Sequence, residues 1–279
     1  MEDGGFTIVT KGSKRCAHGN RGKGPRYSPS SSAALGAHDA TAEEAVAAVG
    51  RAVDLLERSE WLSQVVALVG DHAEGMAGPD EGARAEAAPA PRVAGTGTGV
   101  AGGLQAMVCY GIGHFGVSRA SALQAGLAIH LRKRLGIHGP MFIYDPVLTE
   151  NEQRAARSLG FTLLTVNEVG LRVVQEATLF YMPHCGRRLY SNVLRANWGA
   201  AGLARVLIVG NSFEGYRLRM LTDEKAKRSC CVERLGDARC RESRLPRAEE
   251  EDVFADTAVM TFPSSLLQDH EVSLASDYG

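Results

Sequence analysis

The chain has 279 residues, 44% of them hydrophobic, which is enough apolar material for one large domain or two small ones. Its formal net charge of -1 offers no general attraction to nucleic acid or to an acidic membrane. No apolar run reaches the roughly 18 residues that span a bilayer, and the N-terminus lacks the apolar core of a signal peptide. We therefore expect neither a membrane segment nor a specific nucleic-acid partner.

The cysteines are scattered along the chain without paired C-x-x-C spacing. This pattern is typical of reduced thiols and predicts that the chain has no disulfide framework. Reduced thiols in turn predict a cytoplasmic protein, with nuclear localisation as a further expectation. It also predicts no metal site. The six cysteines are Cys16, Cys109, Cys185, Cys230, Cys231 and Cys240.

The N-terminal third contains a predicted tail and a predicted helical segment. Residues 1–36 are basic and rich in Gly and Ser, so they bury too little apolar surface to fold alone; we predict a disordered tail, with a nuclear-targeting or RNA-binding role as the alternative. Residues 37–69 form the helical segment. Thr41 and Glu44 make a capping-box signature there, and Ser59 is placed to cap a second helix. We prefer a helical hairpin packed on the main domain; a partner-binding helix is the alternative.

The rest of the chain is predicted to be a linker followed by one α/β domain. Residues 70–103 are dominated by Gly, Ala and Pro and predict a flexible linker. Residues 104–270 alternate short apolar strands with helices, which predicts a Rossmann-like, mostly parallel sheet with helices on both faces. The expected strands are 106–110, 141–144, 161–166, 178–182, 205–209 and 257–262. The expected helices span about 118–135, 149–160, 167–174 and 189–198, and residues 221–252 are expected to be helical at first and then irregular.

A G-x-G-x-x-G pattern, formed by Gly111, Gly113 and Gly116, follows the first expected strand and precedes a helix. The first glycine permits a tight turn, and the second lets the backbone approach a ligand. The start of the helix offers unpaired N–H groups to an anion. This context predicts a phosphate-bearing or S-adenosylmethionine-type ligand, while a tight turn without a ligand is the alternative.

Polar residues also follow the other strands of the predicted sheet, at the edge where open α/β sheets bind ligands. Asp145 ends the second strand, where an acidic residue holds a ribose hydroxyl in Rossmann folds, although Asp-Pro also begins turns. Ser212 either contacts a ligand or only caps the next helix. The candidate ligand-binding residues are Gly111, Gly113, His114, Asp145, His184, Cys185, Asn211 and Ser212.

His184 and Cys185 are residue types found in nucleophilic catalysis and haem ligation. Adjacent residues of an extended segment point to opposite sides, so these two form no thiolate–imidazole pair unless a turn separates them. The helix that follows would lower the pKa of the Cys185 thiol, but no third group to orient a base is evident. We therefore assign no catalytic residue and prefer a binding role for both.

At these residues the chain resembles the SRR-like domain family, named for "sensitivity to red light reduced", and most closely its animal-type members. The resemblance covers about 106–220 and the last strand, whereas 222–247 depart from the pattern. It implies a Rossmann-like regulatory protein, linked to circadian and clock-gene regulation and to control of haem biosynthesis, with no established catalytic activity. The matching motifs are CYGIGHF (109–115), IYDPVLTENE (143–152), LGFTLLTVNEVG (159–170), LFYMPHCGRRLYSNVLRANW (179–198) and VLIVGNSFEGY (206–216).

Three functions compete on these grounds. The preferred one is a regulatory protein that binds a small ligand, with a nucleotide, S-adenosylmethionine and haem as candidates, and acts through an unidentified protein partner. The second is an S-adenosylmethionine-dependent methyltransferase or another nucleotide-cofactor enzyme. Against it, the fourth strand ends in Met182-Pro183-His184-Cys185 and not in an acidic or Asn-Pro-Pro-aromatic motif. The third is haem handling through His184 and Cys185.

Overall fold

The computed structural model describes residues 39–74, 76, 103–219, 230–248 and 251–267, all within one compact unit that spans 39–279. The predicted tail at 1–36 and nearly all of the predicted linker at 70–103 lie outside the described residues. The expected helical start of 221–252 lies outside them too. None of the described helices is both long and apolar enough to cross a membrane.

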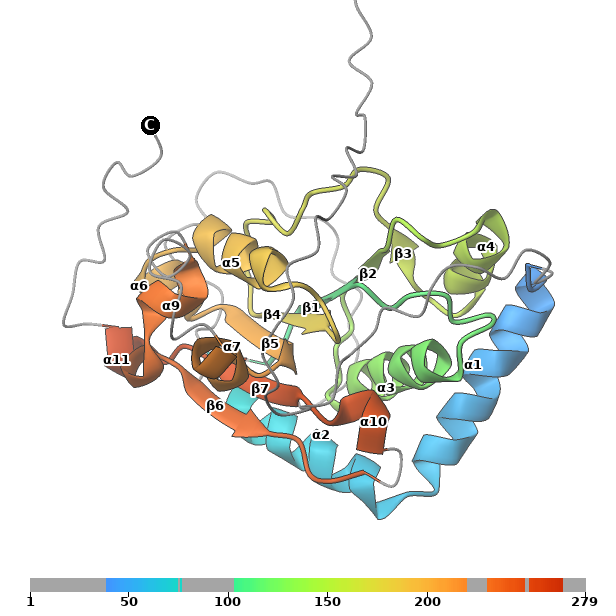
Figure 1. Cartoon of the computed structure of the whole chain (residues 1–279), viewed down its shortest axis with the longest axis horizontal. Helices are drawn as coiled ribbons and strands as arrows, with labels where there is room; N and C mark the ends of the chain where they lie inside the picture. The colour runs from blue at the N-terminus through green and yellow to red at the C-terminus, as the bar shows by residue number, and fades with distance from the viewer. Residues whose placement is uncertain (1–38, 75, 77–102, 220–229, 249–250, 268–279) are drawn as a thin grey trace, which may run out of the picture. The chain divides into compact units, whose positions relative to one another are not determined.

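A mostly parallel sheet of seven strands forms the centre of the molecule (Figure 1). The strands are β1 (Ala106–Tyr110), β2 (Met141–Tyr144), β3 (Thr162–Leu163), β4 (Thr178–Met182), β5 (Val206–Asn211), β6 (Arg241–Arg244) and β7 (Thr257–Thr261). Their order is β3-β2-β1-β4-β5-β7-β6, and β7 alone runs in the direction opposite to the other six strands. The first five strands thus follow the order of the Rossmann fold.

Helices pack on both faces of the sheet, as the alternating sequence pattern predicts (Figure 1). One face carries α1 (Ala42–Glu57), α2 (Glu60–Ala73), α3 (Arg119–Arg134), α4 (Glu150–Ser158) and α10 (Glu251–Phe254). The other carries α5 (Arg187–Ala196), α6 (Ala200–Leu203), α7 (Phe213–Arg219), α9 (Cys231–Leu235) and α11 (Ser264–Leu267). A 3-10 turn, Asp237–Arg239, precedes β6.

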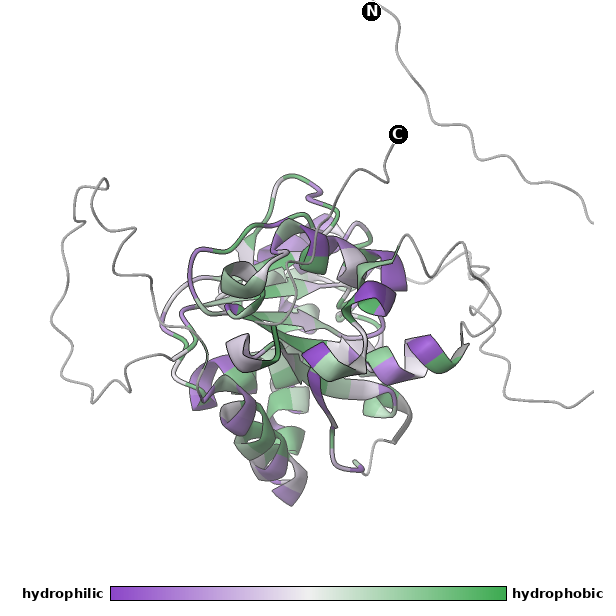
Figure 2. Cartoon of the chain, turned by 90° about the vertical axis from the view of Figure 1, so that its left-hand side faces the viewer, coloured by the Kyte–Doolittle hydropathy of each residue, from purple (hydrophilic) through white to green (hydrophobic). Residues whose placement is uncertain are grey.

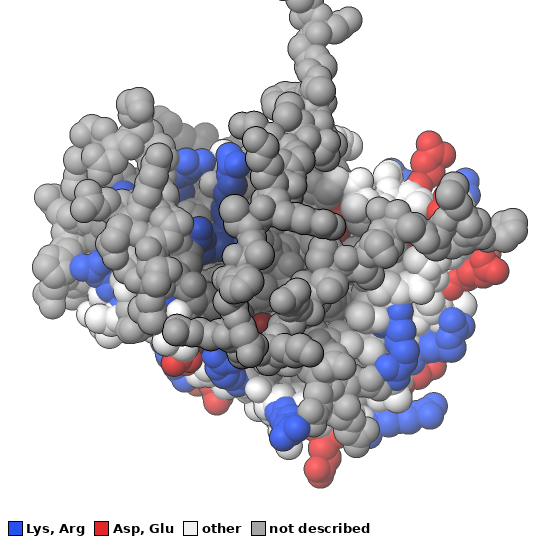
Figure 3. Space-filling view, in the orientation of Figure 1, with Lys and Arg blue, Asp and Glu red and all other residues white. Residues whose placement is uncertain are grey.

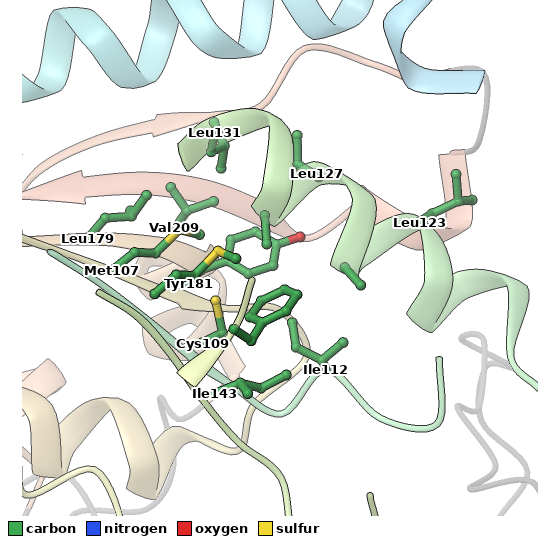
Figure 4. Close-up of a cluster of buried hydrophobic side chains, with 14 of the residues drawn as sticks. Met107, Cys109, Ile112, Leu123, Leu127, Leu131, Ile143, Leu179, Tyr181 and Val209 are labelled. Atoms are coloured by element: carbon green, nitrogen blue, oxygen red, sulfur yellow. The ribbon is translucent and has the colours of Figure 1, made fainter. Parts of the chain in front are cut away.

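Two hydrophobic cores result, because successive residues of a strand point to opposite faces. On one face Cys109 and Tyr181 pack beneath Leu123, Leu127 and Leu131 of α3 (Figure 4). The other face has its own core of strand and helix residues. Figure 2 shows the hydrophobic residues concentrated along the strands and the polar residues on the outer faces of the helices. With both faces covered, β4 and β7 are buried along their whole length.

The N-terminal helices pack on the sheet domain, as predicted. Thr41 caps α1 in a capping box, and the Ser59 side chain accepts a hydrogen bond at the start of α2. Gly126 brings α3 close to α1, because a Cβ added there would lie 3.2 Å from the Val53 nitrogen. His130 Nε2 then donates to the Val53 carbonyl oxygen at 2.9 Å. The family motifs begin after α1 and α2 in the chain. The contacts of these two helices with the sheet domain are therefore not encoded by those motifs.

Three expectations are wrong: the helix at 167–174, the full length of the strand at 161–166, and the irregular structure at 241–244. Residues 167–174 form turns and not a helix, because the Asn167 side chain accepts from the Val169 N–H at 2.9 Å and Val169 and Gly170 have left-handed φ angles of 45° and 79°. The third strand is only Thr162–Leu163, and the backbone bends at 165–166. Residues 241–244, expected to be irregular, form β6 by pairing with β7. Their charged sequence carries no strand pattern, and the pairing depends on β7.

A buried histidine between α2 and the sheet makes the stability of this fold dependent on pH. The His72 nitrogens lie 3.0 Å from the hydroxyl oxygens of both Thr261 and Ser243, and the residue is 2% exposed. Burial, and secondarily the charge of Arg241, lowers the pKa of His72 from 6.5 to about 4. Between these values the unfolded chain binds a proton that the folded chain does not.

We therefore expect the free energy of unfolding to decrease, by at most about 3 kcal/mol, as the pH falls from about 6.5 to about 4. Urea denaturation across this pH range measures the effect. His72→Gln should flatten the profile, whereas His138→Gln, at an exposed site, should leave it unchanged. An unaltered pH slope in His72→Gln would contradict this assignment.

Candidate functional site

The glycine-rich turn after β1 depends on glycine for both conformation and packing. Gly111 and Gly113 have left-handed φ angles of 69° and 77°. A Cβ added to Gly111 would lie 2.6 Å from Cys185 Sγ, and one added to Gly113 would lie 2.8 Å from the Ser121 hydroxyl oxygen. The turn therefore packs tightly against the segment that follows β4 and against α3.

Asp145, at the end of β2, is directly bonded to this turn. The Gly113 N–H donates to Asp145 Oδ2 at 2.7 Å, and the Val147 N–H donates to the other carboxylate oxygen at 3.1 Å. A carboxylate thus occupies the N–H of the second glycine, the one whose backbone was expected to approach a ligand. The predicted neighbours Gly113 and Asp145 are brought together, with the acidic side chain held at the edge of the sheet.

Glu152 holds the second half of the turn, and sequence reasoning missed this role. Its side chain is 3% exposed and accepts from Gly116 N–H at 2.9 Å, Thr149 N–H at 3.1 Å and His114 Nδ1 at 2.9 Å. The bond to Thr149 is local and completes a capping box at the start of α4. The contacts with His114 and Gly116 span more than thirty residues and follow from the parallel pairing of β1 with β2.

The His114–Glu152 pair has the geometry of an oriented base. Because a carboxylate accepts from Nδ1, the neutral His114 ring carries its proton there and keeps a lone pair on Nε2. The His114 side chain is 44% exposed. Such a pair can accept a proton from a bound molecule.

Cys185 and His184 are both engaged within the protein. The Cys185 thiol is 7% exposed and donates to the Tyr110 carbonyl oxygen at 3.4 Å; burial, together with the charge of Asp145, raises its pKa to about 12. His184 has a left-handed φ of 56°, and its Nε2 donates to the Val253 carbonyl oxygen at 2.8 Å. The protonated thiol is a poor nucleophile and a poor metal ligand.

Asn211 joins the carboxyl ends of β4 and β5. Its side-chain oxygen accepts from the His184 N–H at 2.9 Å, and its amide donates to the Tyr216 hydroxyl at 2.9 Å. The Tyr216 hydroxyl donates to the Cys185 carbonyl oxygen at 2.7 Å, and the Asn211 N–H donates to the Tyr190 hydroxyl at 2.8 Å. The two tyrosines complete a hydrogen-bond network that the sequence alone did not reveal.

Ser212 caps a helix, which is one of the two roles that the sequence predicted for it. Its hydroxyl oxygen accepts from the Gly215 N–H at 3.0 Å at the start of α7. The same hydroxyl donates to Glu242 on β6 at 2.6 Å. Ser212 therefore belongs to the junction of β5, β6 and α7, away from the glycine-rich turn.

A third acidic group, Glu168, borders the site beside β1. It accepts from the Tyr110 hydroxyl at 2.9 Å and forms a two-point ion pair with Arg172, at 2.9 and 2.7 Å. Arg172 lies over the Phe142 ring, 4.6 Å from its centroid. Burial, and secondarily Glu168, raises the pKa of Tyr110. The turn that replaces the expected helix at 167–174 positions this cluster.

The eight candidate residues thus lie along the carboxyl edge of β1, β2, β4 and β5, as the parallel sheet predicts. The structure brings six of them together in pairs: Gly111 with Cys185, Gly113 with Asp145, and His184 with Asn211. His114 and Ser212 bond instead to residues outside the set. Ligand binding by these residues stays a prediction. Within the described ranges, no group of three or more His, Cys, Asp or Glu side chains could hold a metal ion.

Comparison with known proteins gives the family of the chain. Residues 93–261, more than half of the chain, match the SRR1 domain. The SRR1-like protein of Mus musculus is 45% identical over 116 residues, which are 41% of this chain and 47% of the relative. Protein SENSITIVITY TO RED LIGHT REDUCED 1 of Arabidopsis thaliana is 36% identical over 151 residues (53% and 54%). The SRR1-like protein of Drosophila melanogaster is 30% identical over 165 residues (59% and 57%).

The chain spans about half the length of these curated relatives. No solved structure gave a match. The family match covers β1 to β7 and all eight candidate residues, but neither α1 nor α2. The resemblance seen in the ordered motifs is confirmed, and the chain belongs to the SRR1 family.

Proposed function

We propose that this SRR1-family protein is a regulatory protein that binds a small ligand at the carboxyl edge of β1, β2 and β4 and acts through a protein partner. The Gly113–Asp145 hydrogen bond carries the proposal, because it places a fixed carboxylate beside a glycine-rich turn. The turn follows β1, and the strand order reverses between β1 and β4. Ligands of open α/β sheets bind at such a reversal.

The charges around the turn favour a ligand without phosphate groups. Asp145 and Glu152 already accept the N–H groups of Gly113 and Gly116, so a phosphate placed there would meet two carboxylates. Ribose hydroxyls donate to carboxylates, and a sulfonium cation is attracted by them. S-adenosylmethionine or a related nucleoside is therefore the proposed ligand class, ahead of phosphorylated nucleotides.

We extend the proposal to the cellular role that the family resemblance implies: circadian and clock-gene regulation and control of haem biosynthesis, in the cytoplasm and also in the nucleus. The name of the Arabidopsis thaliana relative refers to red-light sensitivity of that protein. Direct haem ligation is the weaker candidate here. The Cys185 thiol is buried and protonated, and His184 Nε2 is bonded to a backbone carbonyl.

Isothermal titration calorimetry of the full chain tests the ligand class. S-adenosylmethionine or S-adenosylhomocysteine should bind, and Asp145→Asn should weaken binding about tenfold by removing the charged acceptor. NAD, ATP and haem should bind more weakly. The exposed Glu150→Gln variant is the matched control and should bind like the unmodified chain. A folded sample that binds none of these compounds would exclude the proposed site.

Methyl transfer is the second candidate function, favoured by two features of the structure. His114, oriented by Glu152, can accept the proton of a nucleophile. The sheet inserts the antiparallel β7 between β5 and β6, an order typical of S-adenosylmethionine-dependent methyltransferases; this is a fold-level analogy. A crystal structure with S-adenosylhomocysteine should show contacts to Gly113 and Asp145, and a cofactor bound elsewhere would exclude this candidate.

A further inference from the structure

Two exposed valines follow β2 and β3 at the edge of the sheet that carries Asp145. Val147 comes two residues after Asp145 and is 45% exposed, and Val166 follows β3 and is 68% exposed. The two strands are parallel neighbours, with Ile143 beside Leu163, so the segments that follow them leave the sheet at the same edge. Both valines therefore present apolar surface at the end of the sheet where the proposed ligand binds.

Hydrogen bonds fix Val147 relative to the Asp145 carboxylate. The Val147 N–H donates to Asp145 Oδ1 at 3.1 Å, and the Leu148 N–H donates to the Asp145 carbonyl oxygen at 3.3 Å. The Gly113 N–H donates to Asp145 Oδ2 at 2.7 Å. Each carboxylate oxygen can accept more than one hydrogen bond, so a ribose hydroxyl can still donate to this group. A ribose bound there brings the base attached to it towards the turn that carries Val147.

Asn167, directly after Val166, presents hydrogen-bond donors to the solvent. Its side-chain oxygen accepts from the Val169 N–H at 2.9 Å, which fixes the orientation of the amide because the amide nitrogen cannot accept this bond. Among the described residues, the Asn167 amide nitrogen has no hydrogen-bond partner, and the residue is exposed. A purine base has apolar faces and acceptor nitrogens along its edges. Val166 and Asn167 offer a contact to each.

The surroundings of Asn167 favour an uncharged ligand group. Glu168, the next residue, is already paired with Arg172 at 2.9 and 2.7 Å and accepts from the Tyr110 hydroxyl at 2.9 Å. Figure 3 shows uncharged side chains, in white, at the upper right of the molecule, where Figure 1 places β3. An uncharged planar base gains apolar contact here without having to compete for an ion pair.

We propose that Val147, Val166 and Asn167 bind the adenine base of the ligand. The valines contact the ring, and the Asn167 amide donates to one of its acceptor nitrogens. The proposal rests on the proposed function, because Asp145 positions the ribose. It adds the selection of the base, which the carboxylate and the glycine-rich turn do not provide.

Isothermal titration calorimetry of the full chain with S-adenosylhomocysteine measures these contacts. Val166→Asp should weaken binding about tenfold, because it places a charge against the ring. Asn167→Asp should weaken binding about fivefold or more, since it removes the amide donor but keeps the acceptor for the Val169 N–H, so that the turn is retained. Val173→Asp is the matched control: it adds the same charge at a site that is 61% exposed on the same segment, and it should bind like the unmodified chain.

Deaza analogues of S-adenosylhomocysteine, each lacking one ring nitrogen, give an independent readout. One of them should bind the unmodified chain about fivefold more weakly than the parent compound, and this difference should disappear in Asn167→Asp. If Asp145→Asn weakens binding but Val166→Asp and Asn167→Asp behave like Val173→Asp, the base lies elsewhere; the proposal is then overturned and the proposed function stands. No binding of S-adenosylhomocysteine to the folded, unmodified chain would overturn both.

Discussion

Replacing Glu152 with alanine is expected to lower the free energy of unfolding by about 3 to 5 kcal/mol. The carboxylate is buried and accepts hydrogen bonds from Gly116 N–H, Thr149 N–H and His114 Nδ1. Alanine would leave these donors without their acceptor beneath the packed end of the glycine-rich turn. Urea denaturation at neutral pH measures the loss.

Glu150→Ala is the matched control, since Glu150 lies in the same first turn of α4 but is exposed. Only a helix-terminal charge is removed there, so the expected loss is below about 1 kcal/mol. Glu152→Gln should fall between the two variants, because the amide keeps one acceptor oxygen. Equal losses in Glu152→Ala and Glu150→Ala would show that the tertiary bonds of Glu152 contribute nothing.

Gly111→Ala should lower the free energy of unfolding by about 2 to 4 kcal/mol, from two separable causes. The left-handed φ of 69° strains any residue with a Cβ, and that Cβ would lie 2.6 Å from Cys185 Sγ. Gly136→Ala isolates the first cause, because its φ is 65° and a Cβ there meets nothing within 4 Å. Gly136→Ala should therefore cost only about 1 to 2 kcal/mol.

The contact with sulfur is tested by adding Cys185→Ala to Gly111→Ala. Removing Sγ should relieve the overlap, so the double variant should lose less stability than the sum of the two single variants. If the stability losses of the two single variants simply add up in the double variant, the overlap with Sγ is not what destabilises Gly111→Ala. If Gly111→Ala and Gly136→Ala lose equal stability, the close packing of the turn on Cys185 has no energetic weight.

Most strands and capped helices could be predicted because their determinants are local. The strands at 106–110, 141–144 and 178–182 are short apolar runs between turn residues, and the structure has the same limits. The capping box at Thr41 depends on residues three apart, and it forms. The helix expected at 167–174 failed because one Asx turn and two left-handed residues outweighed a weak helical pattern.

The sequence predicted where the candidate site lies but not which hydrogen bonds form within it. A parallel sheet brings the ends of β1, β2 and β4 to one edge, so Gly113, Asp145 and His184 could be grouped from the expected parallel direction of the strands. Glu152, Tyr190 and Tyr216 form hydrogen bonds with residues that are too far away along the chain for a local motif to indicate them. The bond between Tyr216 and Asn211 is an exception, because these residues are close in sequence. The same holds for Glu242, whose strand exists only by pairing with β7.

By itself the sequence determined the α/β class, the family, and the edge of the sheet where polar residues collect, because apolar periodicity, glycine spacing and capping residues all act over a few positions. The tertiary structure alone decided that Asp145 and Glu152 occupy the backbone donors of the glycine-rich turn, and that Cys185 is buried beneath it. Those contacts join residues about thirty to seventy-five positions apart. Their partners are chosen by packing of the whole sheet, and no local pattern encodes that choice.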